Sequence, residues 1–93
     1  MHQVGERVGV ILGWTPDEPK VIKFLGYGIY DGDLPGGPLG SYPNPRITLE
    51  KGGVIWGCEC WWGSEEEIKA TLERHKAQGY TIREITLERE TTQ

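Results

Sequence analysis

The sequence lacks the features that mark several large classes of small proteins. No run approaches the roughly 18 apolar residues of a membrane-spanning helix. The first ten residues, MHQVGERVGV, have neither the basic start nor the apolar core of a signal peptide. The formal net charge of −4 argues against a general nucleic-acid binder, which normally carries a basic stripe, and against an anionic membrane surface. We therefore expect a cytoplasmic protein with neither a membrane nor a nucleic-acid partner.

Cysteine and histidine are scarce as well. The two cysteines, Cys58 and Cys60, would have α-carbons roughly 6.5–7 Å apart on an extended strand, which is the outer limit for a disulfide. A structural zinc ion needs four ligands, and His2 and His75 have no usable spacing, so we expect no metal and no other cofactor. Free, buried thiols are the simplest interpretation, with redox or nucleophilic chemistry as the alternative.

Motifs for catalysis are also missing. The chain has no nucleophile elbow, no phosphate-binding loop and no Cys–His pairing at a meaningful spacing. The acid pair Asp31 and Asp33 belongs to a type that is common in turns, and no calcium-loop glutamate follows it. We therefore expect a protein that is not an enzyme.

What the sequence does contain is a dense set of glycines and prolines, followed by a charged, regular segment. Residues 1–63 hold 13 of the 14 glycines and all six prolines. Neither half could bury a core alone, so the 93 residues are expected to form one domain, 1–93.

Apolar runs bounded by turn residues predict five strands. They cover Val8–Leu12, Lys20–Tyr30, Arg46–Glu50, Val54–Trp62 and Tyr80–Arg89. The TPDEP turn predicts a hairpin between the first two strands. The stretch DGDLPGGPLGSYPNP, residues 31–45, predicts a long irregular loop, which in a small domain is usually functional or mobile.

A helix is predicted after the fourth strand. Ser64 is a good N-cap, Glu67 completes a capping box, and Gly79 is the expected C-cap. An apolar stripe runs along the helix through Ile68, Leu72 and a half-buried His75. The order β-β-loop-β-β-α-β predicts an α+β fold, a mostly antiparallel sheet of about five strands with one helix on one face.

The fourth predicted strand, VIWGCECWWG, is unusually aromatic. Alternation along it places one set of side chains under the helix, namely Val54, Trp56, Cys58, Cys60 and Trp62. The opposite set is Ile55, Gly57, Glu59 and Trp61. The second strand also alternates between two apolar faces. One helix cannot cover a sheet that is apolar on both sides, so the long loop, a second copy of the chain or a ligand must cover the remaining face.

Ligand binding on that second face gives a set of candidate residues: Trp61, Glu59, Tyr27, Tyr30, Asp31, Asp33, Asn44 and Arg46. Trp61 would stack on a flat ring, the acids would accept hydrogen bonds from amines or hydroxyls, and Asn44 and Arg46 would hold a phosphate or carboxylate. Structural alternatives remain open for each. Asp31-Gly32-Asp33 and Asn44 are turn signals, Arg46 could pair with Glu50 or Glu59, and the tyrosines could be ordinary sheet residues.

Two segments, FLGYGIYDGD and PNPRITLEKGGVIWGCECWWGSEE, resemble small uncharacterised proteins carried by bacteriophages and some bacteria. The resemblance covers roughly residues 22–67 and implies no settled activity. A phage setting implies action in the host cytoplasm, where a small homo-oligomer could sequester a nucleotide immune signal. We therefore predict a non-enzymatic binder of a small nucleotide-like ligand that acts as a homo-oligomer. The alternative is a protein–protein inhibitor or adaptor that blocks a host defence enzyme.

Overall fold

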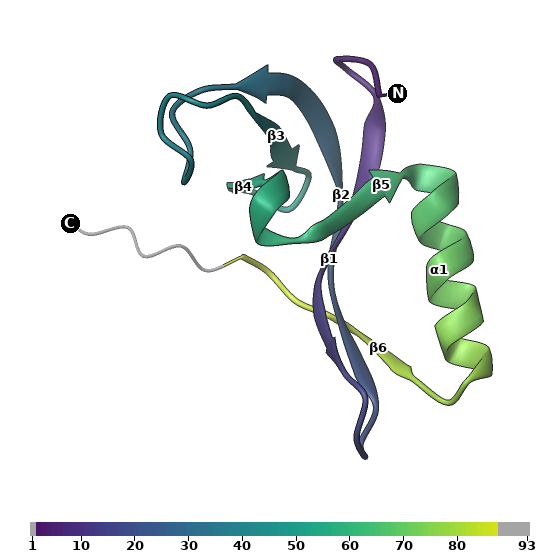
Figure 1. Cartoon of the computed structure of the whole chain (residues 1–93). Helices are drawn as coiled ribbons and strands as arrows, with labels where there is room; N and C mark the ends of the chain where they lie inside the picture. Colours follow the sequence, from purple (N-terminus) through teal and green to yellow (C-terminus); the bar gives the residue numbers. More distant parts are fainter. Residues whose placement is uncertain (1, 88–93) are drawn as a thin grey trace.

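The computed structural model describes residues 2–87 and shows an α+β fold (Figure 1). The chain forms a mostly antiparallel sheet with one helix packed against it, as predicted, and the sheet has six strands where about five were expected. Its elements are β1 (Arg7–Thr15), β2 (Val21–Leu34), β3 (Asn44–Leu49), β4 (Val54–Trp56), the 3-10 turn η1 (Gly57–Glu59), β5 (Trp61–Ser64), α1 (Glu65–Ala77) and β6 (Thr81–Glu84).

The sheet has the strand order β4-β3-β2-β1-β5. Only η1 and Cys60 connect β4 to β5, although these strands stand at opposite ends of that order. Five neighbouring strands laid flat would span about 19 Å, whereas a 3-10 turn advances only about 2 Å per residue. The sheet must therefore curl until its two ends approach one another, which gives it an inner face that its own strands cover.

β2 is the central strand, and it serves three neighbours. β1 lies antiparallel to it along one edge. The other edge is divided between β3, which pairs with Gly28–Leu34, and β6, which pairs in parallel with Val21–Phe24. The predicted β1–β2 hairpin is thus confirmed, and Figure 1 shows its far end reaching beyond the other strands.

Two bulges interrupt the alternation of β2. The pairs Val10–Gly26 and Ile11–Phe24 leave Leu25 as an extra residue, and the pairs Tyr30–Ile47 and Gly32–Arg46 do the same for Asp31. Each extra residue precedes a glycine with positive φ, 93° at Gly26 and 112° at Gly32, the conformation that such bulges favour. The first bulge moves Tyr27 to the same face as Phe24, so strict alternation along β2 is wrong.

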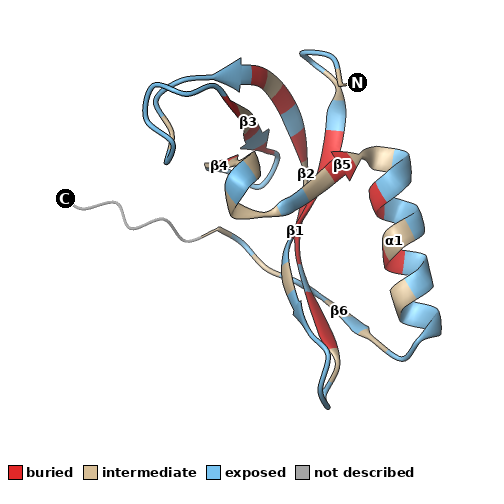
Figure 2. Cartoon of the chain, viewed as in Figure 1, coloured by how far each residue is buried: buried red, intermediate tan, exposed pale blue. Residues whose placement is uncertain are grey.

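The interior consists of two hydrophobic clusters, one on each face of the β1–β2 hairpin. The first contains Val8, Val10, Leu25, Tyr30, Ile47, Leu49 and Ile55, with Cys60, Trp62, Ile85 and Leu87 packed at its margin. The second contains Ile11, Ile22, Phe24, Ile68 and Leu72 and lies between the hairpin and α1. Figure 2 shows the buried residues along the hairpin and on the side of α1 that faces it. The two central strands are apolar on both faces, as predicted for the sheet. The prediction that the long loop, a second copy or a ligand must cover the face opposite the helix is wrong for most of that face, because the curled sheet covers it with its own strands.

α1 begins and docks as its sequence predicts. The Ser64 hydroxyl accepts a hydrogen bond from the Glu67 N–H at 3.1 Å, and the Glu67 carboxylate accepts one from the Ser64 N–H at 3.0 Å. Ile68 and Leu72 are buried and His75 is half-buried. A β-carbon at Gly9 would lie 2.7 Å from Cγ2 of Ile68, so the helix rests directly on the bare backbone of β1.

The predicted strand Val54–Trp62 is wrong as a single strand, because η1 breaks it. Within η1, a β-carbon on Gly57 would lie 2.8 Å from the Trp62 Nε1 atom and 2.9 Å from Pro45, so both side chains close over this glycine. The Glu59 carboxylate accepts a hydrogen bond from the Trp56 N–H at 3.0 Å and holds the turn. As a result, Trp62 and Cys60 pack against the first cluster and not under the helix.

Two further boundaries differ from the prediction. The loop expected at residues 31–45 is shorter, because β2 continues to Leu34 and β3 already begins at Asn44. β6 ends at Glu84, whereas the prediction ran to Arg89. Residues 88 and 89 lie outside the described part of the chain.

Candidate functional site

The eight residues predicted to bind a ligand fall into several groups. Asp31, on the second bulge, accepts hydrogen bonds through its Oδ2 atom from Arg46 at 2.9 Å and from the Thr48 hydroxyl at 2.6 Å. This pairing differs from the carboxylate partners proposed for Arg46, because Glu50 instead binds Arg7. The Asp31–Arg46 pair joins β2 to β3 at the bulge.

Tyr30 and Asp33 form the second group. The Tyr30 hydroxyl donates a hydrogen bond to Asp33 at 2.5 Å, and its ring stacks on Trp62 with centroids 5.4 Å apart. The hydrogen bond to Asp33 raises the pKa of Tyr30 to about 12, and desolvation adds to the shift. Tyr30 belongs to the first cluster, so its contacts are those of an interior residue.

Asn44 and Glu59 lie around η1. Asn44 is only 2% exposed, and its amide donates a hydrogen bond to the Cys58 sulfur at 3.0 Å. Both cysteines are free thiols, as predicted, but the prediction that both are buried is wrong, because Cys58 is exposed. The reason is η1, because Cys58 lies in the middle of this turn and is exposed there, while Cys60 follows the turn and packs against the first cluster.

The two thiols are expected to react at very different rates. Burial, with smaller effects from Glu59 and Cys58, raises the pKa of Cys60 to about 12, so almost no thiolate forms there near neutral pH. We expect a thiol reagent at pH 8 to label Cys58 in the native protein and to reach Cys60 only after denaturation. Mass spectrometry of the digested protein measures this, with a Cys58→Ser variant as the control. Equal labelling of both thiols in the native state would contradict the structure.

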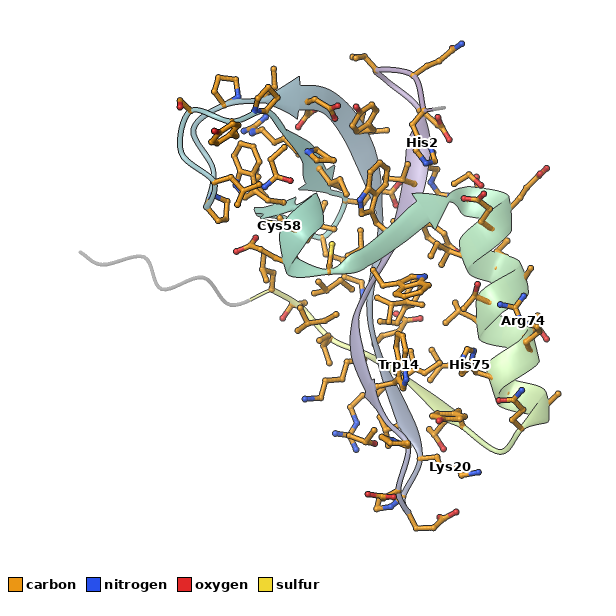
Figure 3. The ribbon with its side chains drawn as sticks, viewed as in Figure 1. His2, Trp14, Lys20, Cys58, Arg74 and His75 are labelled. Atoms are coloured by element: carbon orange, nitrogen blue, oxygen red, sulfur yellow. The ribbon has the colours of Figure 1, made fainter. Side chains whose placement is uncertain are left out.

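The prediction that Trp61 lies on the face opposite the helix is wrong, because the break at η1 shifts the alternation. Trp61 instead takes part in a row of aromatic side chains along the helix side of β1. Its ring lies 5.5 Å from that of Trp14, Trp14 lies 5.9 Å from His75, and His75 lies 5.1 Å from Tyr80. Figure 3 shows Trp14 and His75 facing one another between β1 and α1. Trp61 is 57% exposed and Trp14 is 38% exposed, so the row presents two indoles to solvent.

Tyr27, the last of the eight, lines a hollow between α1 and the β2–β6 pair. The hollow has a volume of about 470 Å³, a size typical of small-molecule sites. Its lining consists of Phe24, Tyr27, Lys69, Leu72, Glu73, Lys76, Ile82 and Glu84. The rings of Phe24 and Tyr27 meet edge to face with centroids 5.3 Å apart. We refer to this hollow as the helix–sheet pocket.

The helix–sheet pocket combines an apolar interior with a charged rim. Phe24, Leu72 and Ile82 belong to the second cluster or pack against it. The rim carries two lysines and two glutamates, each with one ion-pair partner: Lys69 with Glu65, Lys76 with Glu73 and Glu84 with Lys51, at 3.1, 3.6 and 3.2 Å. Both lysines are largely exposed, so their ion pairs are weak and can exchange for contacts with a ligand.

Arg7 closes one side of Tyr27. Its guanidinium lies 4.4 Å from the centre of the Tyr27 ring, and it binds Glu50 and Glu65. Hydrogen bonds from Arg7 lower the pKa of Glu50, and those from Lys69 and Arg7 lower the pKa of Glu65. The Tyr27 ring therefore contacts Arg7 as well as Phe24.

A second hollow of about 560 Å³ is lined by Leu12, Lys23, Glu84, Ile85 and Thr86. None of these residues is aromatic, so this hollow offers no flat surface for a ring to stack on. The helix–sheet pocket is therefore the better candidate, although it contains only Tyr27 of the eight predicted residues. Whether the other seven bind a ligand stays a prediction.

The helical residues of the pocket were missed, although the sequence carried a signal for them. Lys69, Leu72, Glu73 and Lys76 follow the spacing i, i+3, i+4, i+7, so they share one face of a helix. Ile82 and Glu84 enter the pocket only because β6 returns beside β2. No local sequence pattern predicts the pairing of β6 with β2.

Among residues 2–87, no three His, Cys, Asp or Glu side chains gather closely enough to hold a metal ion. The one α-helix in that range is too short and too polar to cross a membrane. In comparisons with protein-family models, curated proteins and solved structures, no match to this chain is found.

Proposed function

We propose that this protein binds a small nucleotide-like ligand in the helix–sheet pocket without transforming it. The observation that carries the proposal is the presence of aromatic rings, ammonium groups and carboxylates around one hollow of about 470 Å³. Each of these groups matches one part of a nucleotide. A flat base suits the apolar interior with its Phe24 and Tyr27 rings, and a phosphate suits the exposed lysines.

The carboxylates account for the remaining polar groups of such a ligand. Glu73 and Glu84 stand on opposite walls, one on α1 and one on β6. A carboxylate accepts hydrogen bonds from ribose hydroxyls or exocyclic amines. A purely lysine-lined rim would favour any anion, whereas the mixed rim favours a ligand that carries both an anionic group and hydrogen-bond donors.

The phage setting implied by the sequence resemblance suggests a biological role for this binding, namely sequestration of a nucleotide signal. A protein that holds a nucleotide signal without consuming it lowers the free concentration of that signal in the host cell. Such a role requires affinity and abundance and needs no catalytic group. In this setting the proposed ligand is a signalling nucleotide of the host.

Thermal unfolding in the presence of a nucleotide panel tests the proposal. A ligand with a Kd in the micromolar range, present at a thousandfold excess over Kd, stabilises the native state by about 4 kcal/mol. Lys76→Glu is expected to weaken binding of such a nucleotide about tenfold or more, because a hydrogen bond to a charged group contributes about 1.5–3 kcal/mol. Isothermal titration calorimetry measures the change in Kd.

Arg74→Glu is the matched control for this variant. It makes the same charge change in the last turn of α1, but Arg74 is not part of the pocket lining. Equal weakening by both variants would show a general charge effect and would remove the pocket from the proposal. Absence of stabilisation across the panel would count against nucleotide binding altogether, and recovery of an altered nucleotide by mass spectrometry would show turnover.

A further inference from the structure

One edge of β1 is paired along only half of its length. Val8–Ile11 pair with β5, whereas among residues 2–87 no strand pairs with Leu12–Thr15 on that side. An unpaired edge offers backbone N–H and C=O groups to any strand that comes alongside, and proteins usually protect such edges with charged side chains or proline. The four residues LGWT contain neither, although Leu12 is the extra residue of a bulge on β1, because Ile11 pairs with Phe24 and Gly13 with Lys23. The backbone N–H and C=O groups of this open edge are therefore unpaired in the described part of the chain, and no charged or proline side chain on the segment protects them.

The surface around the open edge carries three exposed apolar side chains, of which Leu12 also lines a hollow with Lys23 and Glu84. Trp61 is 57% exposed, Trp14 is 38% exposed and Leu12 is 39% exposed. With about 250 Å² for a whole indole, these three side chains leave roughly 300 Å² of apolar area in solvent. That amounts to more than a third of the roughly 800 Å² that each partner buries in a standard interface.

We propose that the open edge of β1 joins two copies of this chain, whose Leu12–Thr15 segments pair antiparallel across a two-fold axis. A strand that pairs with its own copy must be complementary to itself, and an uncharged segment meets that requirement. Each copy carries a net charge of −4, so two copies repel unless they meet through neutral residues. LGWT is such a stretch, and it lies beside the two exposed indoles.

The pairing would also cover the tryptophans. β5 begins at Trp61, which pairs with Ile11, so a strand added along Leu12–Thr15 lies end to end with β5 and against its indole. Trp14 stands on the same row, 5.5 Å from Trp61. Each copy would thus shelter the exposed indoles of the other, and this arrangement does not depend on the proposed ligand.

Substitutions at Gly13 provide the sharpest test, because this position has room. A β-carbon there meets no atom within 4 Å, and no positive φ is required. Gly13 pairs with Lys23 of β2, so Gly13→Lys would gather four cations where two copies meet, since like charges on facing strands repel. Gly13→Ala is the matched control, because it changes the same position without adding charge.

Sedimentation velocity of the full chain over a range of about 1 to 500 µM covers micromolar dissociation constants. We expect a concentration-dependent dimer for the natural sequence and for Gly13→Ala. Gly13→Lys should weaken the dimer at least tenfold while keeping the native far-UV circular dichroism, and Trp61→Ala should weaken it as well. A natural sequence that stays monomeric throughout would overturn the proposal. The proposal would also be overturned if Gly13→Lys dimerised with unchanged affinity, or if the edge paired only with a strand of a different protein.

Discussion

Replacing Gly28 by alanine is expected to lower the free energy of unfolding by about 3 kcal/mol, near the upper end of the range for overpacked interiors. An added β-carbon would lie 2.4 Å from the Thr48 carbonyl oxygen and 3.0 Å from the Leu49 α-carbon. Both are backbone atoms, so no side-chain rotation relieves the clash. β3 would have to move away from β2 as a whole. Chemical denaturation followed by tryptophan fluorescence measures the loss.

Gly13→Ala supplies the comparison, since both variants add one methyl group to the β1–β2 hairpin. At Gly13 the methyl group meets open space, so the variant should be neutral or slightly more stable, by up to about 1 kcal/mol, because alanine restricts the unfolded chain. Equal stability of the two variants would mean that β3 does not lie against Gly28 as closely as the structure has it.

Replacing Ile68 by alanine is expected to lower the free energy of unfolding by about 3 kcal/mol, within the range measured for buried large-to-small substitutions. Ile68 is 1% exposed, and it is the residue through which α1 rests on Gly9. Gly9→Ala should also destabilise the protein, by about 1–3 kcal/mol, because the new methyl group would lie 2.7–2.8 Å from Cγ2 and Cβ of Ile68.

The double variant Gly9→Ala/Ile68→Ala tests whether the two residues are in contact or whether each substitution destabilises the protein independently. Shortening Ile68 to alanine removes Cγ2 and Cγ1, two of the three atoms that the Gly9→Ala methyl group would strike, and leaves only Cβ. The combined loss should therefore be smaller than the sum by about 0.5 kcal/mol or more, as for residues in contact. Urea unfolding of the natural sequence, both single variants and the double variant gives the coupling energy. If the losses of the two single variants simply added up in the double variant, Gly9 and Ile68 would not be in contact, and α1 would lie elsewhere on the sheet.

Local signals were sufficient for the helix and for the hairpin. Ser64 and Glu67 form their reciprocal hydrogen bonds within four residues of chain, so nothing distant decides where α1 begins. The TPDEP turn likewise joins two apolar strands that are neighbours in sequence and in space. Features whose partners lie within a few residues could be predicted from the sequence.

The break between β4 and β5 could not be predicted in this way. Alternation through VIWGCECWWG fits one strand as well as two, and the decision comes from Pro45 and Trp62, which close over Gly57. Pro45 stands twelve residues before that glycine in the chain. Tertiary packing therefore overrides the two-residue alternation, which taken alone fits a continuous strand.

The β2 bulges changed which residues share a face. Without the extra residue Leu25, Tyr27 would not stand beside Phe24, and the helix–sheet pocket would lack its second ring. Glycines follow both extra residues, at Gly26 and Gly32, but Gly26 lies within an apolar run whose local pattern fits a regular strand. Regular alternation through Gly26 puts Phe24 and Tyr27 on opposite faces, and this is the physical reason why the sequence does not predict the pocket.

The shared hairpin has a consequence for how the domain melts. β1 and β2 contribute to both hydrophobic clusters: Val10 and Leu25 face one, and Ile11 and Ile22 face the other. Neither cluster can dissolve without freeing the strands that the second one needs. The domain should therefore behave as a single cooperative unit, so that its most protected amides lie along the hairpin and exchange with solvent only through global opening.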